Sequence, residues 1–240
     1  RRHRRRTACG AGAPVTATAD PVVLFDMDGV LLTGRGADPA VHVRAMEDVA
    51  TAWDLEVPAA LREPLTQYPY TAALETACET LGVDPARFFD AREHRSAARI
   101  ADRITAGSRP LYDDVEVLEA LSTAATLGVV SNNYDPAVRT AMDHHGLDVF
   151  AVARGRDIGL DGFRRRKPDP HYLQEALGSL GVTAGLYVGD RQTDVEAAQA
   201  AGLSAVYLRR AHNREHDLQV TPEWTIDSLD ELAPIVAQLG

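Results

Sequence analysis

The chain has 240 residues, of which 45% are hydrophobic and 25% charged, as expected for a soluble globular protein with one or two cores. Its formal net charge of −10 argues against a nucleic-acid or anionic-membrane partner, and its longest apolar runs are too short to span a membrane. Cys9 and Cys78 are the two cysteines, too few for a disulfide framework or a multi-cysteine metal site, which favours a reducing cytoplasm.

The first 14 residues contain five arginines and no acidic residue, so the rest of the chain is more acidic than the whole. This segment lacks the apolar stretch of a secretory signal. We predict that residues 1–20 form a disordered basic leader, and the sequence leaves open whether residues 1–14 belong to the working protein. The acidic body, in which arginine replaces lysine almost everywhere, favours the hypothesis of a salt-adapted, halophilic source.

After this leader, short apolar runs alternate with helical patterns. The predicted strands are 21–25, 127–131, 150–153, 185–189, 203–208 and 224–226. The predicted helices between and after them are 115–125, 136–145, 170–180, 193–201 and 227–239. This alternation predicts an α/β fold with a Rossmann-like, doubly wound and mainly parallel sheet.

The segment between the first and second strands has helical periodicity only. Its predicted helices are 39–53, 59–65, 71–81 and 85–105. We therefore predict an inserted α-helical sub-domain over residues 37–108, with residues 21–36 and 109–240 forming the α/β core. Glycines 34, 36 and 107 and Pro110 flank the insert and are candidate hinges.

Two pairs of aspartates follow predicted strands. Asp26 and Asp28 end the first strand at a spacing of two, which places both side chains on one side. Asp190 ends the fourth strand, and Asp194 follows at the start of a helix. Each pair alone is also typical of turns and helix caps. Together, at the shared carboxyl edge of a parallel sheet, four carboxylates require a cation, and Mg²⁺ prefers such oxygen ligands.

Ser131, Asn132 and Lys167 are candidate phosphate ligands. The first two end the second predicted strand and offer donors to a phosphate oxygen, although an ordinary helix start capped by Asp135 would also explain them. Lys167 is the only lysine of a chain with 25 basic residues. Its compact ammonium suits a phosphate, but a single surviving lysine can also be chance.

The segments Asp26-Met-Asp-Gly-Val30, Ser131-Asn132, Lys167-Pro168 and Gly189-Asp190-Arg-Gln-Thr-Asp194 resemble the four motifs of the haloacid dehalogenase-like hydrolases. The resemblance covers about residues 21–232. The helical insert is similar to the cap of the phosphoglycolate phosphatase and β-phosphoglucomutase branch. The resemblance implies that the chain is a Mg²⁺-dependent phosphatase. Such an enzyme would hydrolyse a small phosphorylated metabolite, such as a phosphoglycolate-like compound or a sugar phosphate, through an aspartyl-phosphate.

The resemblance also implies a role for each motif residue. Asp26 would be the nucleophile and Asp28 the general acid and base. Ser131, Asn132 and Lys167 would bind the phosphoryl group, with Ser131 and Lys167 also counted as catalytic. The metal ligands would be Asp26, Asp28 through its backbone carbonyl, Asp190 and Asp194.

Three other functions use the same fold. A phosphomutase would share the catalytic residues and differ in its product. A 2-haloacid dehalogenase lacks the second acid of the first motif, so Asp28 argues against it. A catalytically inactive binding module would be expected to have lost the nucleophile or the metal-binding aspartates, which are present here.

The sequence does not single out a residue that would bind the rest of the substrate. The run Arg164 to Arg166 could bind a second anionic group, although a solvated charged run is favoured, and nothing selects among the insert cations Arg44, Arg62 and Arg95. Oligomeric state is not indicated.

Overall fold

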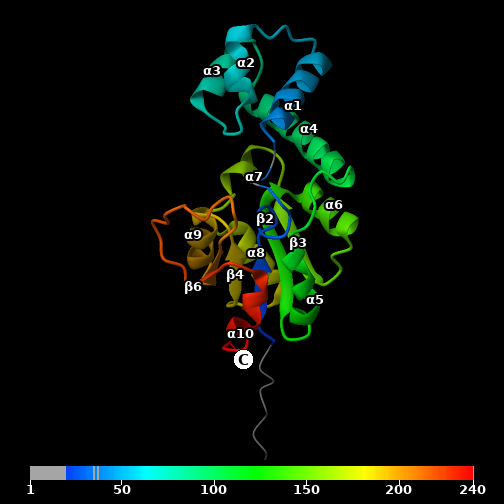
Figure 1. Cartoon of the computed structure of the whole chain (residues 1–240). Coiled ribbons are helices and arrows are strands. Elements are labelled where there is room, and N and C mark those ends of the chain that lie inside the picture. Colours follow the sequence, from blue (N-terminus) through cyan, green and yellow to red (C-terminus); the bar gives the residue numbers. More distant parts are fainter. Residues whose placement is uncertain (1–19, 35, 37, 240) are drawn as a thin grey trace, which may run out of the picture.

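A computed structural model describes residues 20–34, 36 and 38–239 (Figure 1). Six strands form its sheet: β1 (Val22–Phe25), β2 (Thr126–Tyr134), β3 (Phe150–Arg156), β4 (Leu186–Gly189), β5 (Ser204–Leu208) and β6 (Trp224–Ile226). Their order is β3-β2-β1-β4-β5-β6, and each neighbouring pair is parallel. After β1, the chain adds β2 and then β3 on one side of β1. It then crosses to the other side of β1 and adds β4, β5 and β6 there. This topology confirms the predicted doubly wound α/β fold.

The central strands β1 and β4 are buried along their whole length, as their continuously apolar sequences predict, whereas the edge strands β3 and β6 are partly exposed. In β1, Val23 and Phe25 belong to one core, while Val22 and Leu24 belong to another on the opposite face. The first core is covered by α5 (Val117–Leu121), α6 (Asp135–His145) and α10 (Leu232–Val236), and the second by α8 (His171–Leu180) and α9 (Gln192–Ala200). In the part of the chain that is described, no helix has both the length and the apolar character of a membrane span.

Four helices are inserted between β1 and β2: α1 (Pro39–Ala52), α2 (Ala59–Thr66), α3 (Ala72–Thr80) and α4 (Pro85–Thr105). They surround a separate apolar core that includes Phe88 and Phe89 of α4. The far half of α4 instead contributes Ala97, Ile100 and Ile104 to a core of the sheet. This long helix therefore joins the helical insert to the α/β core, as Figure 1 shows.

Several predicted elements differ from the structure. The predicted helix 115–125 is a 3-10 turn, Asp113–Glu116, followed by the short α5, and the closing helix 227–239 shortens to a 3-10 turn, Leu229–Glu231, and α10. A five-residue helix, α7 (Leu160–Arg164), was not predicted, because it is too short to show periodicity. Residues 1–19 of the predicted leader lie outside the described residues.

The second strand also extends further than predicted, to Tyr134, so Ser131 and Asn132 lie inside β2. Asp135 is the first residue of α6 and not its cap, which is Tyr134. The carboxylate of Asp135 accepts the backbone N–H of Gly155 at 3.0 Å, and this contact ties the start of α6 to β3.

Candidate active site

Three aspartates meet at the carboxyl edge of the sheet, where β1 and β4 lie side by side. One carboxylate oxygen from each of Asp26, Asp190 and Asp194 lies within 4.8 Å of the others, and all three residues are buried. Gly29 makes this approach possible: its φ is 86°, and a side chain there would collide with the carboxylate of Asp190. The turn after β1 can therefore pass directly beside the end of β4.

Lys167 lies against these carboxylates. Its Nζ is 3.0 Å from Oδ1 of Asp26 and 2.6 Å from Oδ1 of Asp194. It also donates to the hydroxyl of Tyr187 at 2.5 Å, and that hydroxyl donates to the carbonyl oxygen of Val130 at 2.7 Å. Burial lowers the pKa of Lys167, but Asp194 and Asp26 raise it by more, so the pKa stays above its ordinary value and the ammonium keeps its charge.

The loop that carries Lys167 is tied to β2 by two hydrogen bonds. The backbone N–H of Lys167 donates to Oδ1 of Asn132 at 2.8 Å, and Nδ2 of Asn132 donates to the Lys167 carbonyl oxygen at 3.2 Å. Ser131, next to Asn132, accepts the backbone N–H of Asn133 at 3.2 Å through its Oγ. These contacts place the hydroxyl, the amide and the ammonium on one side of the acidic cluster.

The acidic cluster has more negative charge than Lys167 balances. Burial, together with neighbouring Asp194 and Asp26, raises the pKa of Asp190 to about 8. Burial also raises the pKa of Asp194, although Lys167 opposes this. Within the described residues, Oδ1 of Asp190 is buried and accepts no hydrogen bond. Closely spaced carboxylates with an unsatisfied oxygen fit a hard divalent cation, which Asp26, Asp190 and Asp194 would hold.

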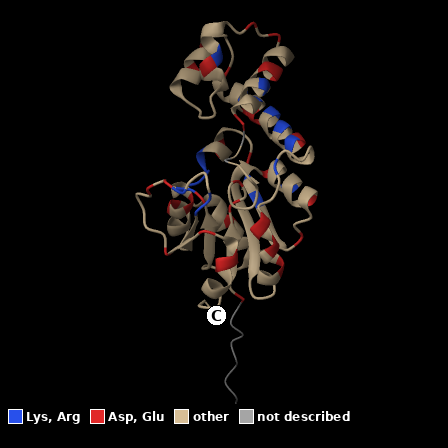
Figure 2. Cartoon of the chain, viewed as in Figure 1, with Lys and Arg blue, Asp and Glu red and all other residues tan. Residues whose placement is uncertain are grey.

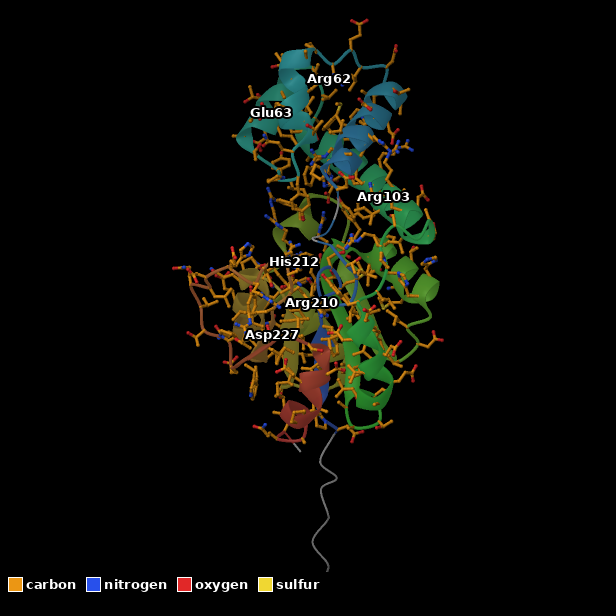
Figure 3. All side chains as sticks on the ribbon, viewed as in Figure 1. Arg62, Glu63, Arg103, Arg210, His212 and Asp227 are labelled. Atoms are coloured by element: carbon orange, nitrogen blue, oxygen red, sulfur yellow. The ribbon has the colours of Figure 1, made fainter. Side chains whose placement is uncertain are left out.

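Two residues from the loop after β5 support Asp190 from its other side. Nε2 of His212 lies 2.5 Å from Oδ2 of Asp190, and Nδ2 of Asn213 donates to the Asp190 carbonyl oxygen at 2.7 Å. Figure 3 labels His212 close to the boundary between the α/β core and the helical insert. Asp194, at the start of α9, accepts the backbone N–H groups of Asp190 and Arg191 at 3.1 and 2.9 Å, so its carboxylate also caps the helix.

Asp28 points to a different set of partners. Its Oδ1 accepts from Nη2 of Arg109 at 2.7 Å, and its Oδ2 accepts from Nδ2 of Asn133 at 2.9 Å. Its side chain is not part of the three-aspartate cluster. The neighbouring Met27 is fully buried in the sheet core, as strand alternation predicts. The two acids of the first motif therefore have separate surroundings, which allows them different tasks.

A cavity of about 620 Å³ lies above these groups, between the sheet edge and the helical insert. Asp26, Asp28, Ser131, Asn132 and Lys167 line its core side. From the insert, the lining residues include Pro39, His42, Val43, Thr66, Gln67 and Tyr68. Its size is in the ordinary range for small-molecule sites.

The other predicted site residues, Asp190 and Asp194, do not line the cavity but cluster with Asp26, which does. The structure does not bring the insert cations to the cavity. Arg62 forms an exposed ion pair with Glu47 at 3.3 Å, and Figure 3 labels it near the end of the insert that is far from the α/β core. Neither Arg44 nor Arg95 lines the cavity.

Sequence reasoning missed five residues that hold the site together: Arg109, Asn133, Tyr187, His212 and Asn213. Of these, Asn133 had a visible signal, because it directly follows Ser131-Asn132. The others act through contacts between distant segments.

Comparison with known proteins identifies the relatives of this chain. A model of the haloacid dehalogenase-like hydrolases matches residues 21–202. Phosphoglycolate phosphatase of Pectobacterium atrosepticum is 29% identical over 229 residues, covering 91% of this chain and 93% of that protein. The phosphoglycolate phosphatase of Rhodospirillum rubrum is 31% identical over 206 residues, covering 80% and 81%.

Two solved structures show the same fold. CbbY from Rhodobacter sphaeroides, in complex with phosphate, has a TM-score of 0.58 at 23% identity and covers 89% of this chain and 96% of its own. β-Phosphoglucomutase from Clostridium difficile has a TM-score of 0.55 at 16% identity, with coverages of 92% and 96%. The fold alone therefore does not separate a phosphatase from a phosphomutase.

Proposed function

Because the chain belongs to the haloacid dehalogenase-like hydrolase family and is a phosphoric monoester hydrolase, we propose that it hydrolyses a small phosphorylated metabolite through an aspartyl-phosphate on Asp26. The observation that carries this proposal is the ammonium of Lys167 between Asp26 and Asp194 at the cavity floor. The phosphoglycolate phosphatase relatives favour a substrate of phosphoglycolate or sugar phosphate size.

In the first step, a carboxylate oxygen of Asp26 attacks phosphorus, and the bond from phosphorus to the ester oxygen breaks. Asp28 gives a proton to the departing alkoxide, which leaves as an alcohol. Each Asp28 oxygen accepts one hydrogen bond, from Arg109 or Asn133, and keeps a second lone pair that can hold the transferred proton. Ser131, Asn132 and Lys167 bind the phosphoryl oxygens, where negative charge is spread in the transition state.

In the second step, Asp28 removes a proton from a water molecule that attacks the same phosphorus. The bond between phosphorus and Asp26 breaks, which releases inorganic phosphate and restores the carboxylate. Asp28 then holds the proton that the next turnover requires.

We assign Mg²⁺ to Asp26, Asp190 and Asp194, with the backbone carbonyl of Asp28 as a further ligand. The three clustered carboxylates and the unsatisfied Asp190 oxygen support a divalent cation. When bound, the ion supplies positive charge beside the transferring phosphoryl group. Tyr187 and Asn132 hold Lys167 in place through hydrogen bonds to its ammonium and its backbone N–H.

We further propose that residues 37–108 act as a cap over the site, with residues 21–36 and 109–240 as its catalytic core. The cavity between them supports this, because its lining comes from both parts. Such a cap would exclude bulk water and present groups that recognise the alcohol part of the ester.

The test is release of inorganic phosphate from a panel of small phosphate esters. We expect activity with Mg²⁺, loss of activity with EDTA, and recovery when Mg²⁺ is restored. Asp26→Asn should abolish turnover without changing the melting temperature much, whereas Asp113→Asn, at an exposed position, should remain active. Retained activity in Asp26→Asn would refute the assignment. An isomeric phosphate ester in place of inorganic phosphate would identify a phosphomutase instead.

A further inference from the structure

Among the described residues, the cationic side chains that line the cavity are Arg156, Arg166, Lys167 and Arg191, and the acidic ones are Asp26 and Asp28. Figure 2 shows basic residues at the end of α7, where the α/β core meets the helical insert. Which of these cations a ligand can use depends on the carboxylates beside each of them.

Three of these cations have carboxylate neighbours. Arg156 is fully buried and binds both oxygens of Glu93, at 2.5 and 2.9 Å. Lys167 forms ion pairs with Asp26 and Asp194. Nε of Arg191 lies 3.7 Å from Oδ1 of Asp190. Each of these three side chains therefore has at least one carboxyl group of the protein beside it.

Arg166 differs from them. In the described part of the chain, no carboxylate lies within ion-pair distance of its guanidinium, and the segments outside that part contain no acidic residue. Burial lowers the pKa of Arg166, because the guanidinium loses water without gaining an adjacent counterion. Its two neighbours in the arginine run, Arg164 and Arg165, are exposed and do not line the cavity.

The orientation of Arg166 is fixed by Phe163. Its guanidinium carbon stacks 3.5 Å from the centre of the Phe163 ring, and its Nη1 donates to the Phe163 carbonyl oxygen at 2.5 Å. Phe163 itself packs in the core of the helical insert. A guanidinium has five N–H donors, and the hydrogen bond to Phe163 uses one of them. The guanidinium of Arg166 is held in place before a ligand binds, which reduces the conformational entropy lost on binding.

We propose that Arg166 binds a second anionic group on the alcohol part of the ester, and so selects substrates with a carboxylate or a further phosphate beside the scissile one. The inference rests on the proposed function, because Lys167 must bind the phosphoryl group that is transferred. A planar guanidinium pairs with either oxyanion through two parallel hydrogen bonds. His42, which lines the same cavity, does not compete as a cation, since burial lowers its pKa to about 4.

The experiment compares kcat/KM for matched esters in the wild type and in variants. One pair is phosphoglycolate and 2-hydroxyethyl phosphate, which differ in a carboxylate; the other is a sugar bisphosphate and its monophosphate. In Arg166→Gln, the preference for the more anionic member should fall about 10- to 100-fold, as expected for a lost charge-assisted contact. Arg166→Lys should recover part of this preference. The control Arg165→Gln removes an exposed neighbouring charge and should keep the wild-type preference.

A binding measurement separates this inference from the catalytic proposal. Calorimetric titration with phosphonoacetate and with methylphosphonate requires no turnover, and Arg166→Gln should weaken the first by about tenfold more than the second. If Arg166→Gln keeps the wild-type ratio in both assays, the inference is wrong, whatever the catalytic activity. If the wild type hydrolyses no ester but Arg166 still discriminates between the two phosphonates, the proposed function fails and the anion site stands. The pair of esters that shows the larger change identifies the anionic group.

Discussion

Arg109 connects the carboxylate of Asp28 to the segment that leads into the helical insert. Its Nη2 donates to Asp28 at 2.7 Å, while its Nε and Nη1 donate to the carbonyl oxygens of Thr33 and Gly36 at 2.9 and 3.0 Å. Arg109 itself lies where the chain returns from the insert. The position of the proposed acid and base is therefore linked to both chain crossings between insert and core.

Replacing this arginine should impair turnover more than substrate binding. In Arg109→Gln we expect kcat to fall by about 10- to 100-fold, with a smaller change in KM, because Asp28 loses the donor that positions it. Arg109→Lys should restore part of kcat. Steady-state kinetics with the panel's best substrate provide the measurement. Arg103→Gln is the control, since its ion pair with Asp38 is 42% exposed on the arginine side; an equal loss in both variants would contradict this role.

The buried pair of Glu93 and Arg156 should dominate the stability of the contact between α4 and β3. Both side chains are 1% exposed, and Glu93 also accepts the hydroxyl of Tyr134 at 2.7 Å. Glu93→Gln leaves a buried guanidinium without its counterion, so the free energy of unfolding should fall by about 3–5 kcal/mol.

Urea titration measures this loss. Asp48→Asn is the control, because its ion pair with Arg99 is about one-third exposed and should contribute less than about 1 kcal/mol. A cost for Glu93→Gln as small as that of the control would show that the buried pair does not stabilise the fold.

The acidic cluster should make the metal-free protein less stable as the pH rises. The pKa of Asp190 is about 8 in the folded state and 3.8 ordinarily, so the folded protein keeps a proton that the unfolded chain has lost. The stabilisation of the folded state by this proton is fully present below pH 3.8 and is lost as the pH approaches 8.

As the pH rises across this range, we expect the melting temperature in chelating buffer to fall. The increase in melting temperature that Mg²⁺ produces should become larger over the same range. Thermal unfolding at a series of pH values, with and without Mg²⁺, measures both effects. In Asp190→Asn both pH dependences should flatten. A Mg²⁺ effect that does not change with pH in the wild type would be inconsistent with a shared proton in the cluster.

His42 should destabilise the protein at low pH. Burial lowers its pKa from 6.5 to about 4, and its Nδ1 lies 3.2 Å from the hydroxyl of Ser96. Because the unfolded chain binds the proton more strongly, stability present above pH 6.5 is lost as the pH falls towards 4, by up to about 3 kcal/mol. His42→Gln should remove this part of the acid loss in urea titrations. His144→Gln, at an exposed position, should leave it unchanged.

The sequence was sufficient to predict the fold class and to collect the motif residues, and the reason is local. Asp26 and Asp28 directly follow β1 at a spacing of two, with Met27 between them buried in the core, and parallel strands bring their carboxyl ends to one edge. These relations involve adjacent residues and a regular sheet, so they follow from periodicity.

Contacts that depend on three-dimensional packing were not predictable in this way. Arg109 and Asp28 are 81 residues apart, and no pattern joins them. Arg164, Arg165 and Arg166 have identical side chains, and only the end of α7 decides that Arg166 lines the cavity. The helix α7 itself is positioned by Phe163 packing into the insert and not by helical periodicity.

The most direct test of the account is to trap the phosphorylated residue. Borohydride added during turnover should reduce an aspartyl-phosphate at Asp26 to homoserine, which peptide mass spectrometry can locate. We expect homoserine at position 26 only when substrate and Mg²⁺ are both present, and none at position 28. Homoserine at position 28, or complete turnover with Asp26 never modified, would contradict the central claim that Asp26 accepts the phosphoryl group.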